Sequence, residues 1–128
     1  EKMALPPCHV MSHFYISNGT ISCHMYHRSA DMFLGVPFNI ASYSLLLSIF
    51  AEILNLKPKK FVHSFGDAHI YLNSVEQVKE QISRKPFSPP KLILPKLNSL
   101  EDLSSYSIDD FKLEGYEHHP AIKAKMAV

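Results

Sequence analysis

The chain has 128 residues, of which 46% are apolar, and this is enough for one domain with a packed core. Thirteen Lys and Arg against twelve Asp and Glu give a formal net charge of +1. A charge so close to zero excludes a general attraction to nucleic acid or to an acidic membrane surface, so any anion binding must be local.

The two cysteines, Cys8 and Cys23, predict free thiols rather than a disulfide framework, because no secretory signal accompanies them. We therefore expect a cytoplasmic protein. The eight histidines are scattered, and the chain contains neither C-x-x-C nor H-E-x-x-H. We expect no metal site.

The stretch L-P-P-C-H at residues 5–9 determines how the chain approaches Cys8. Two prolines fix φ near −65° and remove two backbone donors, so this approach should be stiff and extended. A cysteine is most often a small buried hydrophobic residue. A thiol whose direction is fixed is also a candidate nucleophile, and this stretch alone leaves both interpretations open.

The residues from Val10 to Arg28 predict a β-hairpin. Alternating runs flank the dipeptide N-G at 18–19, which suits a type I′ turn because both central residues need positive φ. The register of a two-residue turn gives three pairs: Ser17 with Thr20, His9 with Arg28, and Cys8 with Ser29. The thiol would then lie within reach of a guanidinium and a hydroxyl, unless a bulge shifts the register.

The apolar run from Phe38 to Leu56 predicts a long helix buried in a protein core, because its apolar residues cover nearly every helical direction. Pro37 suits a first helical turn, and Lys57 with Pro58 ends the helix. Polar residues interrupt the run, which argues against a membrane span. They are Asn39, Ser42, Ser44, Ser48, Glu52 and Asn55.

The residues from Phe61 to Tyr71 predict another strand, with a bulge or bend at Gly66 and Asp67. Strand side chains alternate between faces, so His69 and Tyr71 should lie on the same face. The ordinary interpretation of these two residues is a packed strand end with backbone partners.

The remaining chain predicts one more helix and two more strands. The helix runs from about Asn73 to Arg84, with a capping box formed by Ser74 and Gln77. The prolines of 85–90 predict a loop, and 91–97 and 108–116 predict strands. No repeat or flexible linker divides the chain, so we expect one α+β unit.

The connection from Tyr26 to Ala41 is dense in polar residues although it leads into the most apolar helix. Buried polar groups need partners, so this density indicates a ligand. An arginine with a neighbouring hydroxyl can hold a phosphate, and an asparagine can bind the edge of a pyrimidine or an amide. A cation near Cys8 would favour the nucleophilic thiolate. Taken singly, these residues also suit a surface charge, a helix cap or a turn: Arg28, Ser29, Asp31, Gly35 and Asn39.

Four motifs resemble thymidylate synthase: L-P-P-C-H, C-x-x-Y-x-R-S-A-D-x-x-L-G-V-P-F-N-I-A-S-Y, F-V-H-S-F-G-D-A-H-I-Y and G-Y-x-x-H-P-x-I-K-A-K-M-A-V. They follow one another in order over almost the whole chain. The resemblance implies that residues 1–128 are the carboxyl-terminal part of a thymidylate synthase domain, without its amino-terminal half. It also implies an α+β fold with a mixed sheet packed on a long buried helix, and a homodimer formed through a sheet face.

This family transfers a methylene group from methylenetetrahydrofolate to dUMP and reduces it, giving dTMP and dihydrofolate. The resemblance implies that Cys8 adds to the uracil ring, so that the neighbouring carbon captures the methylene. The implied dUMP-binding residues are Arg28 and Ser29 for the phosphate, Ala30 and Asp31 continuing that wall, Asn39 for the uracil edge, and His69, Ile70 and Tyr71 for the ribose. The implied folate-binding residues are Asp31, Gly35, Ala127 and Val128. No metal, nucleic acid or membrane partner is implied.

The chain departs from the family pattern at several positions. His13 and His27 stand in place of glutamines, Ser74 in place of a histidine and His118 in place of a proline, while residues 87–88 interrupt a proline motif. The family's amino-terminal half, which residues 1–128 lack, supplies a glutamate for proton transfer and further phosphate-binding arginines. We therefore expect these residues alone to be inactive until the same or another chain completes them.

Two other hypotheses remain open on the sequence. The chain could be a non-catalytic remnant that binds nucleotide or dimerises. It could also be a structural fragment, which would expose the apolar helix of 38–56 and aggregate.

Overall fold

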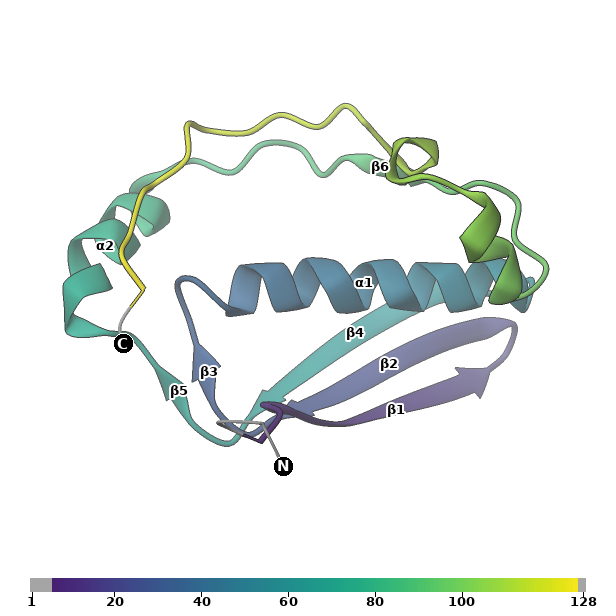
Figure 1. The fold of residues 1–128 in the computed structure, drawn as a ribbon, viewed down its shortest axis with the longest axis horizontal. Helices are drawn as coiled ribbons and strands as arrows, with labels where there is room; N and C mark the ends of the chain where they lie inside the picture. Colours follow the sequence, from purple (N-terminus) through teal and green to yellow (C-terminus); the bar gives the residue numbers. More distant parts are fainter. Residues whose placement is uncertain (1–5, 127–128) are drawn as a thin grey trace.

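The computed structural model describes residues 6–126. A mixed sheet of three strands forms its base: β1 (His9–Ser17), β2 (Thr20–His27) and β4 (Lys57–Phe65), in the order β1-β2-β4. β1 and β2 are antiparallel, whereas β2 and β4 are parallel and are joined by the helix α1 (Val36–Ile53). Figure 1 shows α1 lying between this sheet and the extended segments of the second half of the chain. The α+β prediction is confirmed.

The predicted hairpin turn is present. Asn18 and Gly19 have φ of 50° and 70°, the left-handed values that a type I′ turn needs, and Ser17 pairs with Thr20 as expected. The alternation of β2 then places one set of side chains toward α1, and these residues are buried: Ile21, Cys23, Met25 and His27.

A register shift breaks the hairpin near its open end. The shift falls between His9 and Met11, so that His9 pairs with His27. The backbone N–H of Arg28 donates to the carbonyl of Cys8 at 2.9 Å. An irregularity of this kind is common where a proline-rich segment enters a strand. Two predicted pairs are therefore wrong by one residue: His9 with Arg28, and Cys8 with Ser29.

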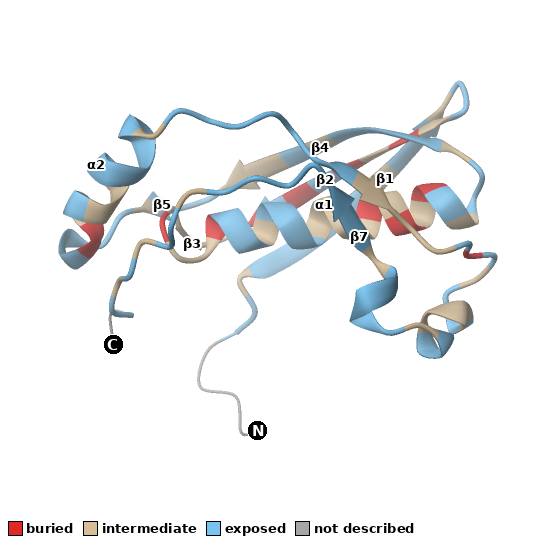
Figure 2. Ribbon diagram, turned by 90° about the horizontal axis from the view of Figure 1, so that it is seen from above, coloured by how far each residue is buried: buried red, intermediate tan, exposed pale blue. Residues whose placement is uncertain are grey.

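The helix α1 begins at Val36 with proline in its first turn, as predicted, and ends at Ile53, three residues before the predicted end. One side packs on the sheet, in a core formed by Ile21, Cys23, Leu47 and Ala51. The first turns of the helix are less covered, because Phe38 is 73% exposed and Ile40 is 45% exposed (Figure 2). The chain itself therefore buries the helix only in part.

By length and composition α1 could span a membrane, although its polar residues were expected to exclude this. The core helix of a water-surrounded domain meets the same criterion, and a single helix of this kind is weak evidence for a membrane. The packing of α1 on the sheet accounts for its apolar composition.

A second, two-stranded sheet lies where the first sheet ends. β3 (Ala30–Asp31) and β5 (Ala68–His69) are parallel, with Asp31 opposite His69. The predicted bend at 66–67 separates β4 from β5. A Cβ atom on Gly66 would lie 2.5 Å from the Tyr26 hydroxyl and 3.0 Å from the Arg28 carbonyl, so the bend needs glycine there.

The rest of the described chain forms short elements around α1: η1 (Leu72–Ser74), α2 (Val75–Ser83), β6 (Lys91–Ile93), η2 (Glu101–Ser105), η3 (Ile108–Asp110) and β7 (Lys112–Glu114). The predicted strands at 91–97 and 108–116 are confirmed in shorter form, as the antiparallel pair β6 and β7. The predicted capping box is wrong, because Ser74 makes no side-chain cap.

Candidate functional site

Cys8 is half-buried at the entrance to β1, beside the end of β2. The Arg28 guanidinium donates to two carbonyls of the proline stretch, to Pro7 at 3.0 Å and to Pro6 at 2.6 Å. Together with the bond between the Arg28 N–H and the Cys8 carbonyl, these contacts fasten the segment that presents the thiol. A phosphate bound by Arg28 would compete with the two carbonyls for its N–H groups.

The residues after Arg28 are fixed by the bend of 66–67. The N–H of Ala30 donates to the Asp67 carbonyl at 2.8 Å, and the N–H of Asp67 donates to the Arg28 carbonyl at 3.0 Å. The Ser29 hydroxyl donates to Asp67 Oδ2 over 3.5 Å, a weak bond that leaves the hydroxyl available to a stronger acceptor. Ala30 is fully buried, and its N–H is already used within the chain.

Asp31 organises the turn that leads into α1. Its Oδ1 accepts from the N–H groups of Phe33 at 2.9 Å and Leu34 at 3.3 Å, and its carbonyl accepts from the N–H of Gly35 at 3.1 Å. A carboxylate that accepts from the backbone two residues ahead is a common turn former. Its Oδ2 has no hydrogen-bond partner within residues 6–126, so one acceptor remains for another molecule.

Asn39 holds a buried acceptor that the described chain leaves without a partner. Its Oδ1 is inaccessible to solvent and makes no hydrogen bond within residues 6–126. A Cβ atom on Gly35 would lie 3.7 Å from this oxygen and 3.2 Å from the Asp31 carbonyl, which shows how closely the three residues are grouped. A buried acceptor without a donor is costly, so this oxygen marks a place for a ligand or a further segment.

The pairing of β3 with β5 brings His69 to the same place. The N–H of Met32 donates to the His69 carbonyl at 2.9 Å, and the ring of Tyr71 lies edge-on to the imidazole, with centroids 5.0 Å apart. Ile70 is exposed between them. The His69 Nδ1 atom lies 3.2 Å from Asp67 Oδ2. From the sequence, Asp67 was expected only as part of a bend. The spacing D-x-H, which places two side chains on the same side of an extended segment, is the signal that could have predicted this contact.

Three imidazoles, one each from β1, β2 and β4, lie together, and the sequence did not predict this cluster. The His9 ring is edge-on to that of His27 at 4.8 Å, and the His27 and His63 rings are stacked at 5.4 Å. His27 is only 4% exposed. Burial, with the charges of neighbouring histidines, lowers the pKa of His27 and of His63 below the ordinary value.

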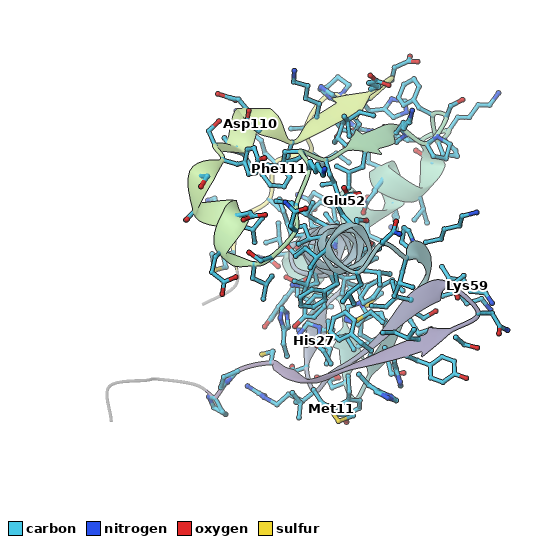
Figure 3. The ribbon with its side chains drawn as sticks, turned by 90° about the vertical axis from the view of Figure 1, so that its right-hand side faces the viewer. Met11, His27, Glu52, Lys59, Asp110 and Phe111 are labelled. Atoms are coloured by element: carbon cyan, nitrogen blue, oxygen red, sulfur yellow. The ribbon has the colours of Figure 1, made fainter. Side chains whose placement is uncertain are left out.

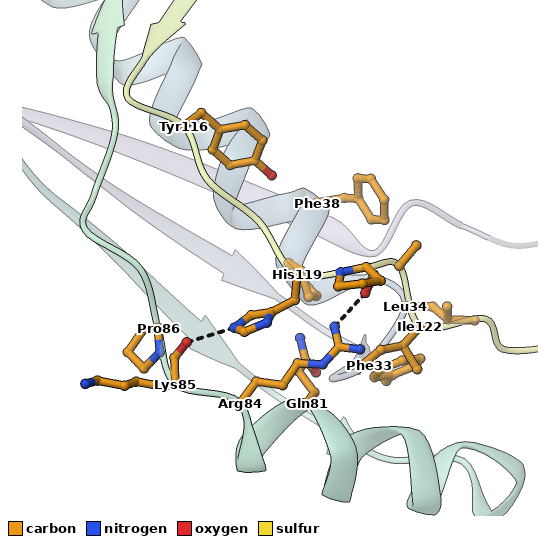
Figure 4. A pocket seen from close by; sticks show the side chains of 13 residues that line it. Phe33, Leu34, Phe38, Gln81, Arg84, Lys85, Pro86, Tyr116, His119 and Ile122 are labelled. Atoms are coloured by element: carbon orange, nitrogen blue, oxygen red, sulfur yellow. Dashed lines mark hydrogen bonds between the residues drawn. The ribbon is translucent and has the colours of Figure 1, made fainter.

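The carboxyl-terminal segment runs back to the same end of the molecule. A cavity of about 580 Å³ lies between this segment, α2 and the start of α1. Figure 4 shows Leu34 and Phe38 among the side chains that line it. Arg84 donates to the Pro120 carbonyl at 2.6 Å, and Asn73 donates to the Lys125 carbonyl at 3.3 Å. The predicted folate residues Ala127 and Val128 lie outside the described residues.

The structure groups most of the predicted site residues around the β3–β5 pair. Cys8 and Arg28 adjoin this group through the backbone, and residues 6–126 contain no cluster of three groups suited to a metal ion. The group consists of Ser29, Ala30, Asp31, Gly35, Asn39, His69 and Tyr71. The molecule is thus an α+β protein in which a cysteine-bearing strand adjoins a polar turn with unused acceptors.

The family model for thymidylate synthase matches residues 1–128, and the chain belongs to that family. Over all 128 residues it is 54% identical to proteins named thymidylate synthase from Mycoplasma mobile and from Staphylococcus haemolyticus. The chain covers 44% and 39% of the length of these two relatives, so it corresponds to about two fifths of such a protein.

Proposed function

We propose that the chain is the carboxyl-terminal catalytic part of a thymidylate synthase, which methylates dUMP to dTMP with methylenetetrahydrofolate. The observation that carries the proposal is the pairing of β3 with β5. It brings Asp31 opposite His69, next to the turn in which Gly35 lies between Asp31 and the unpartnered oxygen of Asn39. Membership of the family over the whole chain supports the same activity.

The grouped residues suit the parts of a deoxyuridine monophosphate. Arg28 and Ser29 supply charged and neutral donors for the phosphate, in a wall continued by Ala30 and Asp31. Asn39 presents a buried oxygen that can accept from the N–H of the uracil ring, and its amide can donate to a ring carbonyl. His69 and Tyr71, with Ile70 between them, face the sugar.

Cys8 serves as the nucleophile. Its thiolate forms a bond to uracil C6, and the electron pair of the C5–C6 double bond moves to C5, where the ring carbonyl stabilises it. C5 then becomes the carbon that captures a one-carbon group. Covalent addition divides a difficult alkylation into easier steps.

Methylenetetrahydrofolate, when bound, supplies the methylene group and the reducing equivalents. The free Oδ2 of Asp31 is the acceptor we assign to its pterin ring, and Gly35 leaves room beside that carboxylate. The carboxyl-terminal segment is held as far as Lys125 by Asn73. We expect Ala127 and Val128 to cover the cosubstrate and exclude water.

Two surfaces need partners for this function. The exposed first turns of α1, with Phe38 and Ile40, suit the amino-terminal part of the family's domain, in the same or another chain. The sheet face away from α1 suits a second copy, as in a homodimer. Figure 3 shows Met11 on this face and His27 on the opposite one. The large exposed side chains of the sheet face away from α1 are Met11, Tyr15, Tyr26 and Val62. We propose that this enzyme works in the cytoplasm.

The test uses the chain joined to the amino-terminal part of the Mycoplasma mobile relative, which we call the completed protein. Incubation with 5-fluoro-dUMP and methylenetetrahydrofolate should give a covalent adduct in the intact mass. Cys8→Ser should abolish the adduct, whereas Cys23→Ala, at a buried core position, should retain it. Absence of the adduct in the folded, completed protein would count against the proposal. Binding of dUMP without turnover would instead favour the non-catalytic remnant.

A further inference from the structure

We propose that Asp67 is a positioning residue of the nucleotide site: it holds His69 in the tautomer that accepts a hydrogen bond from the sugar hydroxyl. This inference rests on the proposed function and adds to it a residue from the bend between β4 and β5.

The backbone fixes the place of Asp67. Its N–H donates to the Arg28 carbonyl at 3.0 Å, and its carbonyl accepts from the N–H of Ala30 at 2.8 Å. The N–H of Gly66 donates to the His27 carbonyl at 2.8 Å, which extends the same ladder by one residue. Asp67 is therefore bound on both sides to the segment that carries the phosphate-binding residues, and its side chain starts from a defined point.

One carboxylate oxygen of Asp67 faces two site residues. Oδ2 lies 3.2 Å from His69 Nδ1 and 3.5 Å from the Ser29 hydroxyl. An ionised carboxylate can only accept hydrogen bonds, so Nδ1 must carry the ring proton. In the neutral imidazole Nε2 is then the acceptor, because the hydrogen bond at one ring nitrogen sets the state of the other.

The exposure of both side chains argues against a role of the contact between Asp67 and His69 in folding stability. The side chain of Asp67 is 64% exposed and that of His69 is 29% exposed, and ion pairs in such surroundings contribute little to folding. The Tyr71 ring, edge-on to the imidazole with an interplanar angle of 87°, holds the ring from another side. The contact with Asp67 therefore acts mainly on the orientation and tautomer of His69.

The resulting pair of groups is complementary to a deoxynucleotide. The sugar of dUMP has one free hydroxyl, because its 5′ oxygen carries the phosphate and its 2′ position has none. This hydroxyl can donate to the Nε2 atom of His69 and accept from the Tyr71 hydroxyl. With the other tautomer, the Nε2 atom of His69 could only donate, and the Tyr71 hydroxyl would have to accept the proton of the sugar hydroxyl instead.

The experiment compares Asp67→Asn with the control Asp109→Asn, at an exposed aspartate in η3, in the completed protein. Nitrogen-15 NMR of the histidine side chains should show His69 protonated at Nδ1 in the wild type and in the control. Asparagine can accept or donate, so Asp67→Asn should lose this single tautomer. Its affinity for dUMP should fall up to about tenfold, the effect of losing one hydrogen bond between neutral groups.

A second nucleotide separates positioning from general damage. The 3′-deoxy analogue of dUMP lacks the hydroxyl, so Asp67→Asn and wild type should bind it equally. An unchanged His69 tautomer, or the same loss of affinity for both nucleotides, would overturn the inference. A wild-type protein that binds no dUMP would count against the proposed function, while the tautomer measurement, which needs no nucleotide, separately decides whether Asp67 fixes His69.

Discussion

The Nδ1 atom of His27 lies 3.3 Å from the Nε2 atom of His63, so one imidazole donates to the other between the neighbouring strands β2 and β4. The ring of His9 touches this pair from β1, the Arg28 side chain follows His27, and the Tyr43 hydroxyl from α1 lies 3.4 Å from His9. No acidic group is among these contacts to balance extra protons. The cluster therefore favours neutral rings.

This cluster predicts sensitivity to acid. The pKa values of His27 and His63 are lowered in the folded state, so below about pH 6.5 the unfolded chain binds more protons than the folded one. The free energy of unfolding should fall as the pH drops below 6.5, by at most about 1.4 kcal/mol per pH unit for each proton. Urea unfolding of the completed protein between pH 5 and 8 measures this slope.

The matched variants for this prediction are His27→Gln and His24→Gln. Glutamine stays neutral, so His27→Gln should reduce the slope. His24 lies on the exposed face, where it contacts only the Ser64 hydroxyl, and its replacement should leave the slope unchanged. Equal slopes in wild type and His27→Gln would show that the cluster does not control acid stability.

Asn39 should separate stability from ligand binding. Its buried Oδ1 has no partner in the described chain, so Asn39→Ala should cost little stability, whereas the affinity for dUMP should fall at least about tenfold. Asn98→Ala is the opposite case, because the Asn98 side chain donates to Asp102 Oδ2 at 3.3 Å and lies away from the site. It should lower the melting temperature and leave the affinity unchanged. Calorimetry of unfolding and of dUMP binding measures both; a large loss of stability in Asn39→Ala would contradict the assignment.

Gly66→Ala should disturb the site through the backbone. The added Cβ would press on the Tyr26 hydroxyl and on the Arg28 carbonyl, and overpacking of this kind costs about 1–3 kcal/mol. Removing the hydroxyl in Gly66→Ala with Tyr26→Phe should restore part of the stability, because the closest contact is then gone. Chemical unfolding of the two variants compares them. Failure of Tyr26→Phe to restore any stability would mean that the carbonyl contact alone limits this position.

The exposed first turns of α1 should make the isolated chain associate. Ile40→Glu should reduce light scattering by residues 1–128 and should also weaken their binding to the amino-terminal part of the Mycoplasma mobile relative added as a separate chain. Ile82→Glu, at an exposed position of α2, is the control and should change neither. Equal effects of the two substitutions would show that α1 is not the binding surface.

Local chemistry allowed the sequence to predict the turn at 18–19, the start of α1 and the bend at 66–67. Each depends on residues with restricted or unusual backbone freedom, such as N-G, P and G-D. The register shift near His9 was not predictable, because a two-residue turn says nothing about an irregularity at the far end of the hairpin. The capping box failed because Ser74, the N-cap of α2, also ends the 3₁₀ turn of 72–74, and its φ of −112° and ψ of 1° are not the extended values typical of a capping residue.

The residues of the candidate site also divide into those that the sequence predicted and those that it did not. Arg28, Ser29, Asp31 and Asn39 stand in one short motif, so their grouping was visible in the sequence. Asp67 was not, since its contact with Ser29 spans 38 positions and exists only because β3 pairs with β5. The histidine cluster likewise joins three strands through side chains that no single motif contains.

The parallel pairing of β3 with β5 has a consequence for the order of events during folding. These strands flank α1, so they cannot meet until the helix has crossed the sheet and the intervening loop has closed, an entropically slow step. The nucleotide pocket would thus be among the last parts of the molecule to acquire its shape. A ligand added during refolding would bind only those molecules in which β3 and β5 have paired. The amount bound would therefore measure the fraction of fully folded protein.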